Sequence, residues 1–111
     1  MWPGRARSGR LRYRSVVTTD SQSEADRAAR VPGTLSVVAG PRGPKWLKLL
    51  CPCGCGDVVS INLMPGRQAW TIRMEREKVS ISPSVVRLAG CRSHFFLVRS
   101  EAWLLRSDTD G

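Results

Sequence analysis

An all-β fold in one small domain is the architecture that this sequence predicts. The chain has 111 residues, which is enough for one domain of ordinary size. From Val31 onward, short apolar or alternating runs are separated by glycine and proline, a pattern typical of many short strands. Four cysteines and the single histidine gather in two short segments, and such clusters commonly hold small folds together by binding a metal ion.

The first predicted strands flank a segment rich in turn residues. Residues 35–39 form an apolar run, and residues 40–44 contain two glycines and two prolines, which indicate a loop. Residues 46–50 resume as a strand. Apolar side chains then alternate with polar ones over residues 59–63, and again over residues 70–74 after a Pro-Gly turn. We expect these last two strands to pair as a hairpin.

The remaining strands lie in the C-terminal third of the chain. Val79 and Ile81 begin another short strand, and residues 94–98 and 102–105 read as a final hairpin. This pattern requires no helix. The predicted β domain therefore spans residues 31–105, and a polar tail follows over residues 106–111.

The first thirty residues differ from the rest in composition. Residues 1–30 carry seven arginines, and residues 18–30 contain no large apolar side chain that could anchor them to a core. We expect a flexible basic arm. The net charge of +9 and the pI near 10.7 permit attraction to nucleic acid, in particular through this arm, or to an acidic protein.

Membrane insertion and export both depend on apolar segments of the chain. No apolar run approaches the roughly 18 residues that a membrane-spanning helix requires. The basic start has no apolar stretch after it of the kind found in secretory signals. We expect a cytoplasmic protein, with no membrane partner, in which clustered cysteines indicate a metal site rather than disulfides.

The motif Cys51-Pro52-Cys53-Gly54-Cys55-Gly56 is followed about forty residues later by Cys91-Arg92-Ser93-His94. Tight turns that contain glycine and proline allow several sulfurs to point at one ion, and zinc takes four such ligands in a tetrahedron. We predict a structural zinc, although cysteine clusters also hold iron. One residue, rather than the usual two, separates the paired cysteines, which makes the motif less specific than a zinc ribbon.

Five candidate ligands compete for four positions around the ion. If Cys51, Cys53, Cys55 and Cys91 bind it, His94 lies beside a structural site and is available for proton transfer. If His94 is a ligand instead, one cysteine becomes a free thiol. From spacing alone, the second arrangement is favoured over catalysis by His94.

These motifs also resemble a family of short bacterial proteins, long described as uncharacterised, that are encoded beside bacterial ubiquitin-like conjugation genes. The resemblance covers residues 31–105, outside the arm. It rests on the cysteine motif together with Leu35-Ser36-Val37, Trp70, Pro83-Ser84-Val85 and Gly90-Cys91-Arg92-Ser93-His94-Phe95-Phe96, in that order. The resemblance implies an accessory factor of such a pathway, which acts on the ubiquitin-like protein or its conjugation enzymes.

The resemblance further implies a peptidase that processes or removes the ubiquitin-like modifier. Ser84 is the serine that the pattern singles out, and His94 is its implied base, because a serine hydroxyl becomes a strong nucleophile when an imidazole takes its proton. The four cysteines then hold zinc and position His94.

Two other functions remain compatible with the residues. In a non-catalytic zinc domain that recruits conjugation enzymes, Ser84 is an ordinary turn hydroxyl. In a nucleic-acid-binding zinc module, the arginine-rich arm contacts phosphates.

Overall fold

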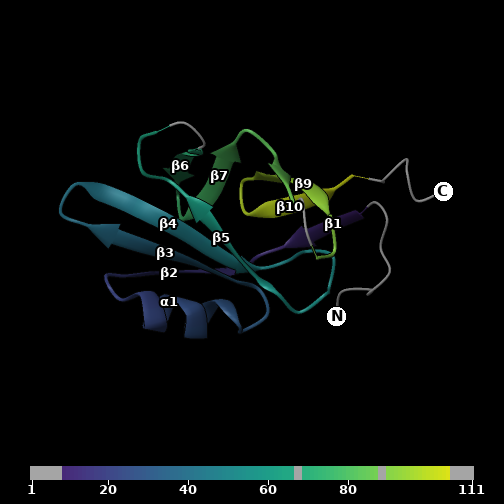
Figure 1. Cartoon of the computed structure of the whole chain (residues 1–111), viewed down its shortest axis with the longest axis horizontal. Helices are drawn as coiled ribbons and strands as arrows, with labels where there is room; N and C mark the ends of the chain where they lie inside the picture. The colour runs from purple at the N-terminus through teal and green to yellow at the C-terminus, as the bar shows by residue number, and fades with distance from the viewer. Residues whose placement is uncertain (1–8, 67–68, 88–89, 106–111) are drawn as a thin grey trace.

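A computed structural model describes residues 9–66, 69–87 and 90–105. Ten strands and one short helix make up this part of the chain (Figure 1). The strands form two four-stranded sheets and one two-stranded hairpin. The predicted all-β architecture in a single small domain is therefore confirmed, with one helix added.

The first sheet has the order β2-β3-β4-β5 and is covered on one face by the helix α1 (Figure 1). Its strands are β2 (Ser15–Thr19), β3 (Thr34–Gly40), β4 (Gly43–Leu50) and β5 (Val58–Asn62). The helix α1 (Gln22–Ala29) connects β2 to β3, which pair in parallel, and the other two pairings are antiparallel. This connection is a β-α-β crossover, because parallel neighbours cannot be joined by a tight turn.

The second sheet has the order β1-β10-β9-β8 and brings the two ends of the described chain together. Its strands are β1 (Gly9–Arg12), β8 (Val85–Val86), β9 (His94–Val98) and β10 (Glu101–Leu104), and all pairings are antiparallel. The strands β6 (Thr71–Glu75) and β7 (Lys78–Ser82) form the separate hairpin, and β7 packs beside β9.

One apolar core lies between these sheets. It includes Leu35 and Leu47 from the first sheet, Phe95 and Leu97 from the second, and Val79 from the hairpin, all fully buried. In β9 and β10 the buried residues alternate with more exposed ones, so the outer face of β9 carries different side chains from the face that packs on the core. The outer face of the second sheet is therefore directed away from the core.

The expected flexible arm is wrong for residues 9–30, which form β1, β2 and α1. Tyr13 is a core residue at 2% exposure, and its hydroxyl donates a 2.8 Å hydrogen bond to the backbone oxygen of Leu50. The prediction failed because β1 is ordered by pairing with β10, a strand that lies ninety residues later in the chain. Residues 1–8 and the predicted tail, residues 106–111, lie outside the described residues.

The expectation that no helix is required is also wrong. Ser21 caps α1, since its hydroxyl accepts a 3.2 Å hydrogen bond from the backbone N–H of Glu24. The helix buries Ala25 and Ala29, four residues apart on one face, instead of large apolar side chains. An alanine face produces a weak hydrophobic signal, which explains why the sequence pattern did not reveal it.

The predicted pairing of residues 59–63 with residues 70–74 is wrong, because β6 pairs with β7. Their two-residue turn, Arg76 and Glu77, has positive φ at both positions, as a tight hairpin between right-twisted strands requires. The predicted 40–44 loop is likewise shorter than expected, since β3 and β4 continue to Gly40 and from Gly43. The described residues contain no helix that is both long and apolar enough to cross a membrane.

Candidate metal and catalytic site

The first cysteine motif forms a tight loop between β4 and β5. The backbone N–H of Cys51 donates to the Asp57 oxygen at 2.8 Å, and the N–H of Gly54 donates to the Cys51 oxygen at 3.1 Å. Gly54 and Gly56 have φ of 90° and 91°, a conformation that residues with a Cβ rarely adopt. The glycines therefore permit the turn that places three sulfurs on one side of the loop.

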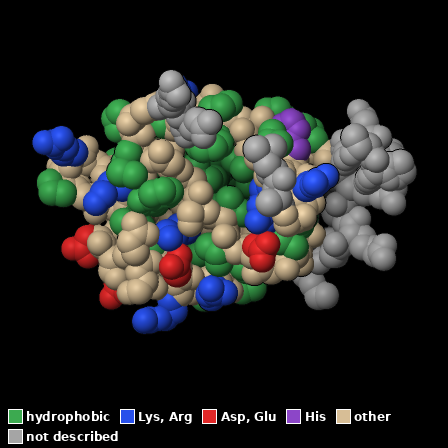
Figure 2. Space-filling model, viewed as in Figure 1, with side chains coloured by type: hydrophobic (Ala, Val, Ile, Leu, Met, Phe, Trp, Pro, Cys, Tyr) green, Lys and Arg blue, Asp and Glu red, His purple; other side chains and the backbone are tan. Residues whose placement is uncertain are grey.

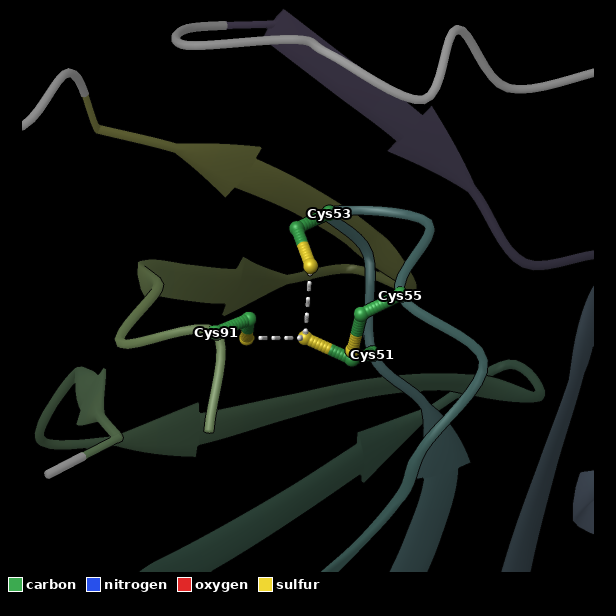
Figure 3. Close-up of side chains that lie close together, drawn as sticks. All are labelled: Cys51, Cys53, Cys55 and Cys91. Atoms are coloured by element: carbon green, nitrogen blue, oxygen red, sulfur yellow. Dashed lines mark hydrogen bonds between the residues drawn. The ribbon is translucent and has the colours of Figure 1, made fainter. Parts of the chain in front are cut away.

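Cys91 reaches this loop from the segment between β8 and β9, so that four sulfurs converge (Figure 3). The Cys51 sulfur lies 3.5 Å from that of Cys53 and 3.6 Å from that of Cys91, and all four sulfurs, including that of Cys55, lie within 4.8 Å of one another. Zinc–sulfur bonds of about 2.3 Å in a tetrahedron place the sulfurs about 3.8 Å apart. The four cysteines thus fit a closed metal site, and the geometry does not distinguish zinc from iron.

Polar side chains around the sulfurs offset the negative charge that metal-bound thiolates carry. The Arg87 guanidinium donates to the sulfur of Cys91 at 3.3 Å and of Cys55 at 3.6 Å, and it also pairs with Asp57 at 3.3 Å. The Ser93 hydroxyl lies 3.2 Å from the Cys51 and Cys91 sulfurs. The sequence reasoning did not find Arg87 and Ser93, because a single arginine or serine near a cysteine carries no distinctive pattern.

The thiols differ in the ease with which they ionise. Partial burial acts to raise the pKa of Cys91, but hydrogen bonds from the side chain and backbone of Ser93 outweigh it, and the pKa is lowered to about 6. Burial, together with hydrogen bonds to Cys91 and Cys51, raises the pKa of Cys53. Cys91 therefore forms a thiolate, the form that binds a metal ion, more readily than Cys53.

His94 lies outside the group of sulfurs and contacts Ser84. The Ser84 hydroxyl oxygen is 2.9 Å from Nε2 of His94, and both side chains are half-buried. The imidazole reaches the molecular surface, where it is the single purple side chain in Figure 2. Ser84 directly precedes β8 and His94 begins β9. Because Val86 pairs with His94 in the antiparallel register, Ser84 lies diagonally across from His94 on the same face. The structure brings together the two residues that the sequence resemblance singled out, with the hydroxyl within hydrogen-bond reach of the imidazole.

Two further contacts hold this serine and histidine in position. The indole Nε1 of Trp70 donates to the backbone oxygen of Ser84 at 3.2 Å. The backbone N–H of Arg87 donates to the Ser93 oxygen at 2.9 Å, which extends the pairing of β8 with β9 toward the metal site. Ser93 contacts the cysteine sulfurs and the next residue, His94, contacts Ser84, so the metal site and the serine–histidine pair share one short segment.

Two carboxylates on the segments around this pair form ion pairs with arginines instead of with His94. Asp57 pairs with Arg87, and Glu101 pairs with Arg12 at 3.3 Å. On its other side, the His94 ring lies 5.8 Å from the ring of Phe96. Within the described residues, the arrangement is a serine–histidine dyad beside an aromatic side chain, with these two carboxylates outside it.

Comparison with known proteins assigns a family. No curated protein and no solved structure matches the chain significantly. The family described as bacterial ubiquitination-like system serine protease (BubE) matches residues 19–104. This match begins twelve residues before residues 31–105, the range over which the sequence resembles its family. The match covers most of the chain and includes all four cysteines, Ser84 and His94. The chain therefore belongs to the BubE family of the bacterial ubiquitination-like system.

Proposed function

We propose that the protein is a serine peptidase that processes or removes the ubiquitin-like modifier of a bacterial conjugation pathway. The observation that carries this proposal is the 2.9 Å contact between the Ser84 hydroxyl and Nε2 of His94. The family match supports the pathway, and the contact supports the chemistry. In this proposal Ser84 is the nucleophile and His94 is the general base.

The reaction follows from the position of these two atoms. Nε2 of His94 takes the proton of the Ser84 hydroxyl as Oγ attacks the scissile carbonyl carbon. The C–N bond then breaks, and His94 gives the proton to the leaving amine, which leaves an ester on Ser84. Water, deprotonated by His94, cleaves the ester, and the proton returns to the Ser84 oxygen. The dyad alone therefore accounts for every proton transfer.

The metal has a structural role in this proposal. Cys51, Cys53, Cys55 and Cys91 would hold zinc in a closed site, which leaves no coordination position for a reacting water. The bound ion would hold the 51–57 loop against the segment that leads into His94. Its contribution is to fix the imidazole relative to Ser84, because the Ser93 hydroxyl joins the sulfurs to that segment.

A fluorophosphonate probe tests the nucleophile without knowledge of the substrate. The activated serine oxygen displaces fluoride from phosphorus and keeps a covalent adduct, which intact-mass spectrometry detects. We expect one adduct on the wild-type protein, none on Ser84→Ala, and unchanged labelling of Ser82→Ala, which removes an exposed hydroxyl two residues away. Cleavage of a modifier–protein conjugate should fall roughly 10³-fold or more in Ser84→Ala.

The alternative function is recruitment of conjugation enzymes by a non-catalytic zinc domain. A folded Ser84→Ala protein that processes the conjugate as fast as wild type, or that takes up the probe equally, would contradict the peptidase proposal. Folded wild-type protein that neither cleaves the conjugate nor takes up the probe, and whose binding to conjugation enzymes survives Ser84→Ala, favours recruitment, because in a binding domain the Ser84 hydroxyl does not contribute to the activity.

A further inference from the structure

The outer face of the second sheet is apolar and basic, and it leads directly to the proposed dyad. Its side chains come from alternate positions of each strand, opposite the face that packs on the core. Phe96 and Trp103 are each 43% exposed, and Val98 is 47% exposed. Aromatic side chains with this much exposure on neighbouring strands are an unusual feature of a free surface and mark an interaction site.

The strand register aligns these side chains into one row. Arg10 pairs with Trp103, and Trp103 pairs with Phe96. One further step in the antiparallel register of β8 and β9 places Ser84 opposite Phe96. The row thus runs from β1 across β10 and β9 to the proposed nucleophile. A molecule that lies on this row meets Ser84 at its end.

The same face continues along β9 into a pocket at the other end of the strand. This pocket, of about 390 Å³, is lined by Arg12, Lys78, Val98, Arg99, Glu101 and Trp103. His94 and Val98 are four residues apart on the same side of β9, which corresponds to roughly 13 Å along an extended chain. The distance between the dyad and the pocket therefore matches about four residues of an extended peptide.

The charges around the pocket favour an acidic occupant. Four cations, those of Arg10, Arg12, Lys78 and Arg99, surround the carboxylate of Glu101. That carboxylate pairs with Arg10 and Arg12. Within the described part of the chain, Lys78 and Arg99 form no salt bridge. They are held beside the β9–β10 turn because the backbone N–H of Arg99 donates to Ser80 of β7 at 2.8 Å.

Two observations favour a peptide over a nucleic acid on this face. The Arg10 guanidinium lies 5.0 Å from the centre of the Trp103 ring and covers one face of the indole, which a stacked base would need. Phe96 and Val98 instead offer apolar contacts for side chains of a protein segment.

From this geometry we infer that the outer face of the β1-β10-β9-β8 sheet binds an extended, apolar and acidic segment of the protein substrate. Apolar side chains of the segment pack on Phe96 and Trp103. An acidic side chain, about four residues from the cleaved bond, enters the pocket at Lys78 and Arg99. This inference deepens the proposed function, on which it rests, because the dyad at the end of the row gives the segment its role as substrate.

Peptide binding tests the inference on the full-length Ser84→Ala protein, which cannot cleave the probe by the proposed route. The probe is a fluorescein-labelled decapeptide with two glutamates at each end and alternating leucine and glycine between them. Its counterpart carries lysines in place of the glutamates. Fluorescence anisotropy measures both affinities, and a twelve-nucleotide oligothymidine is measured in parallel. We expect the glutamate peptide to bind at least tenfold more tightly than the lysine peptide.

A matched pair of charge reversals locates the binding site. Lys78→Glu with Arg99→Glu should weaken the glutamate peptide roughly tenfold, because two attractions become repulsions. Arg42→Glu with Lys45→Glu changes the net charge equally, at the exposed β3–β4 turn, and should leave the affinity within about twofold. Trp103→Ala, an exposed position, should weaken both peptides and tests the apolar part. Thermal melting verifies that every variant folds, and Lys78→Gln with Arg99→Gln replaces any variant that does not.

Three results would overturn the inference. If both charge reversals weaken the glutamate peptide equally, the peptide is attracted to the overall charge of the protein. If the Lys78 and Arg99 reversal leaves its affinity unchanged, the peptide binds elsewhere. If oligothymidine binds more tightly than the peptide and depends on these two residues, the face is a nucleic-acid site. Fluorophosphonate labelling keeps the two proposals separate. If Ser84 is labelled but the peptide binds elsewhere, the peptidase proposal stands and the docking face is wrong. If the peptide binds at the face but Ser84 is not labelled, the binding face stands and the peptidase proposal is wrong.

Discussion

The cysteine site and the serine–histidine pair lie next to each other and differ in how completely their atoms are engaged. Each of Cys51 and Cys91 contacts another cysteine and the Ser93 hydroxyl, and Arg87 adds contacts from outside. Among the residues that the structure describes, the Ser84 hydroxyl makes one hydrogen bond, with His94, at the edge of an exposed sheet face. A group that holds structure has its bonding positions filled, whereas a group that reacts must keep one available for substrate.

The largest expected effect, on metal content and stability, comes from replacing a cysteine. Cys51 is 3% exposed and lies at the centre of the sulfur group, so Cys51→Ser should lose the metal and unfold much of the protein at 37 °C. Metal analysis per chain and circular dichroism measure both effects. Ser60→Ala is the control, since it removes an exposed hydroxyl of β5 and should keep the metal. Full metal content and an unchanged melting temperature in Cys51→Ser contradict the structural role of the site.

His94→Ala separates the two sites. It should retain one metal ion per chain with all four cysteines protected from alkylation, because His94 lies outside the sulfur group. Fluorophosphonate labelling and conjugate cleavage should fall roughly 10³-fold. Loss of the metal together with activity would instead make His94 a ligand, the arrangement that the spacing alone favours.

A smaller effect on metal binding is expected for Arg87, whose guanidinium contacts two of the cysteine sulfurs. Arg87→Gln removes the positive charge beside Cys55 and Cys91 and should weaken metal affinity about 10- to 100-fold, as loss of outer contacts to metal ligands commonly does. Competition with a chelator measures the affinity. The exposed Arg73→Gln, distant in sequence from the cysteines, is the control. Equal affinities in the two variants show that Arg87 does not stabilise the bound thiolates.

The strand pattern was predictable where alternation and turn residues are local. The strands at residues 35–39, 46–50, 59–63, 79–81 and 94–98 were found, within three residues of their observed bounds. The last hairpin was also predicted correctly, since β9 pairs with β10, but β6 was paired with the wrong neighbour. Alternation identifies which face of a strand is buried but not which strand lies beside it.

The prediction of a flexible N-terminal arm was wrong for a related reason. Residues 9–30 have little local hydrophobic signal, and their order comes from distant partners. β1 pairs with β10, Tyr13 packs in the core, and Lys48 of β4 forms a 2.8 Å ion pair with Asp26 of α1. Such contacts are invisible to composition, because each depends on a residue far away in the chain.

By itself, the sequence determined the cysteine motif, its family and the set of five candidate ligands, because residue types and short spacings encode these directly. Only the tertiary structure decided which of the five lie together. The antiparallel pairing of β8 with β9 turns the His94 ring toward Ser84 and leaves four sulfurs together. The exposed outer face of the second sheet likewise exists only after β1, β10 and β9 align, since its side chains come from opposite ends of the chain.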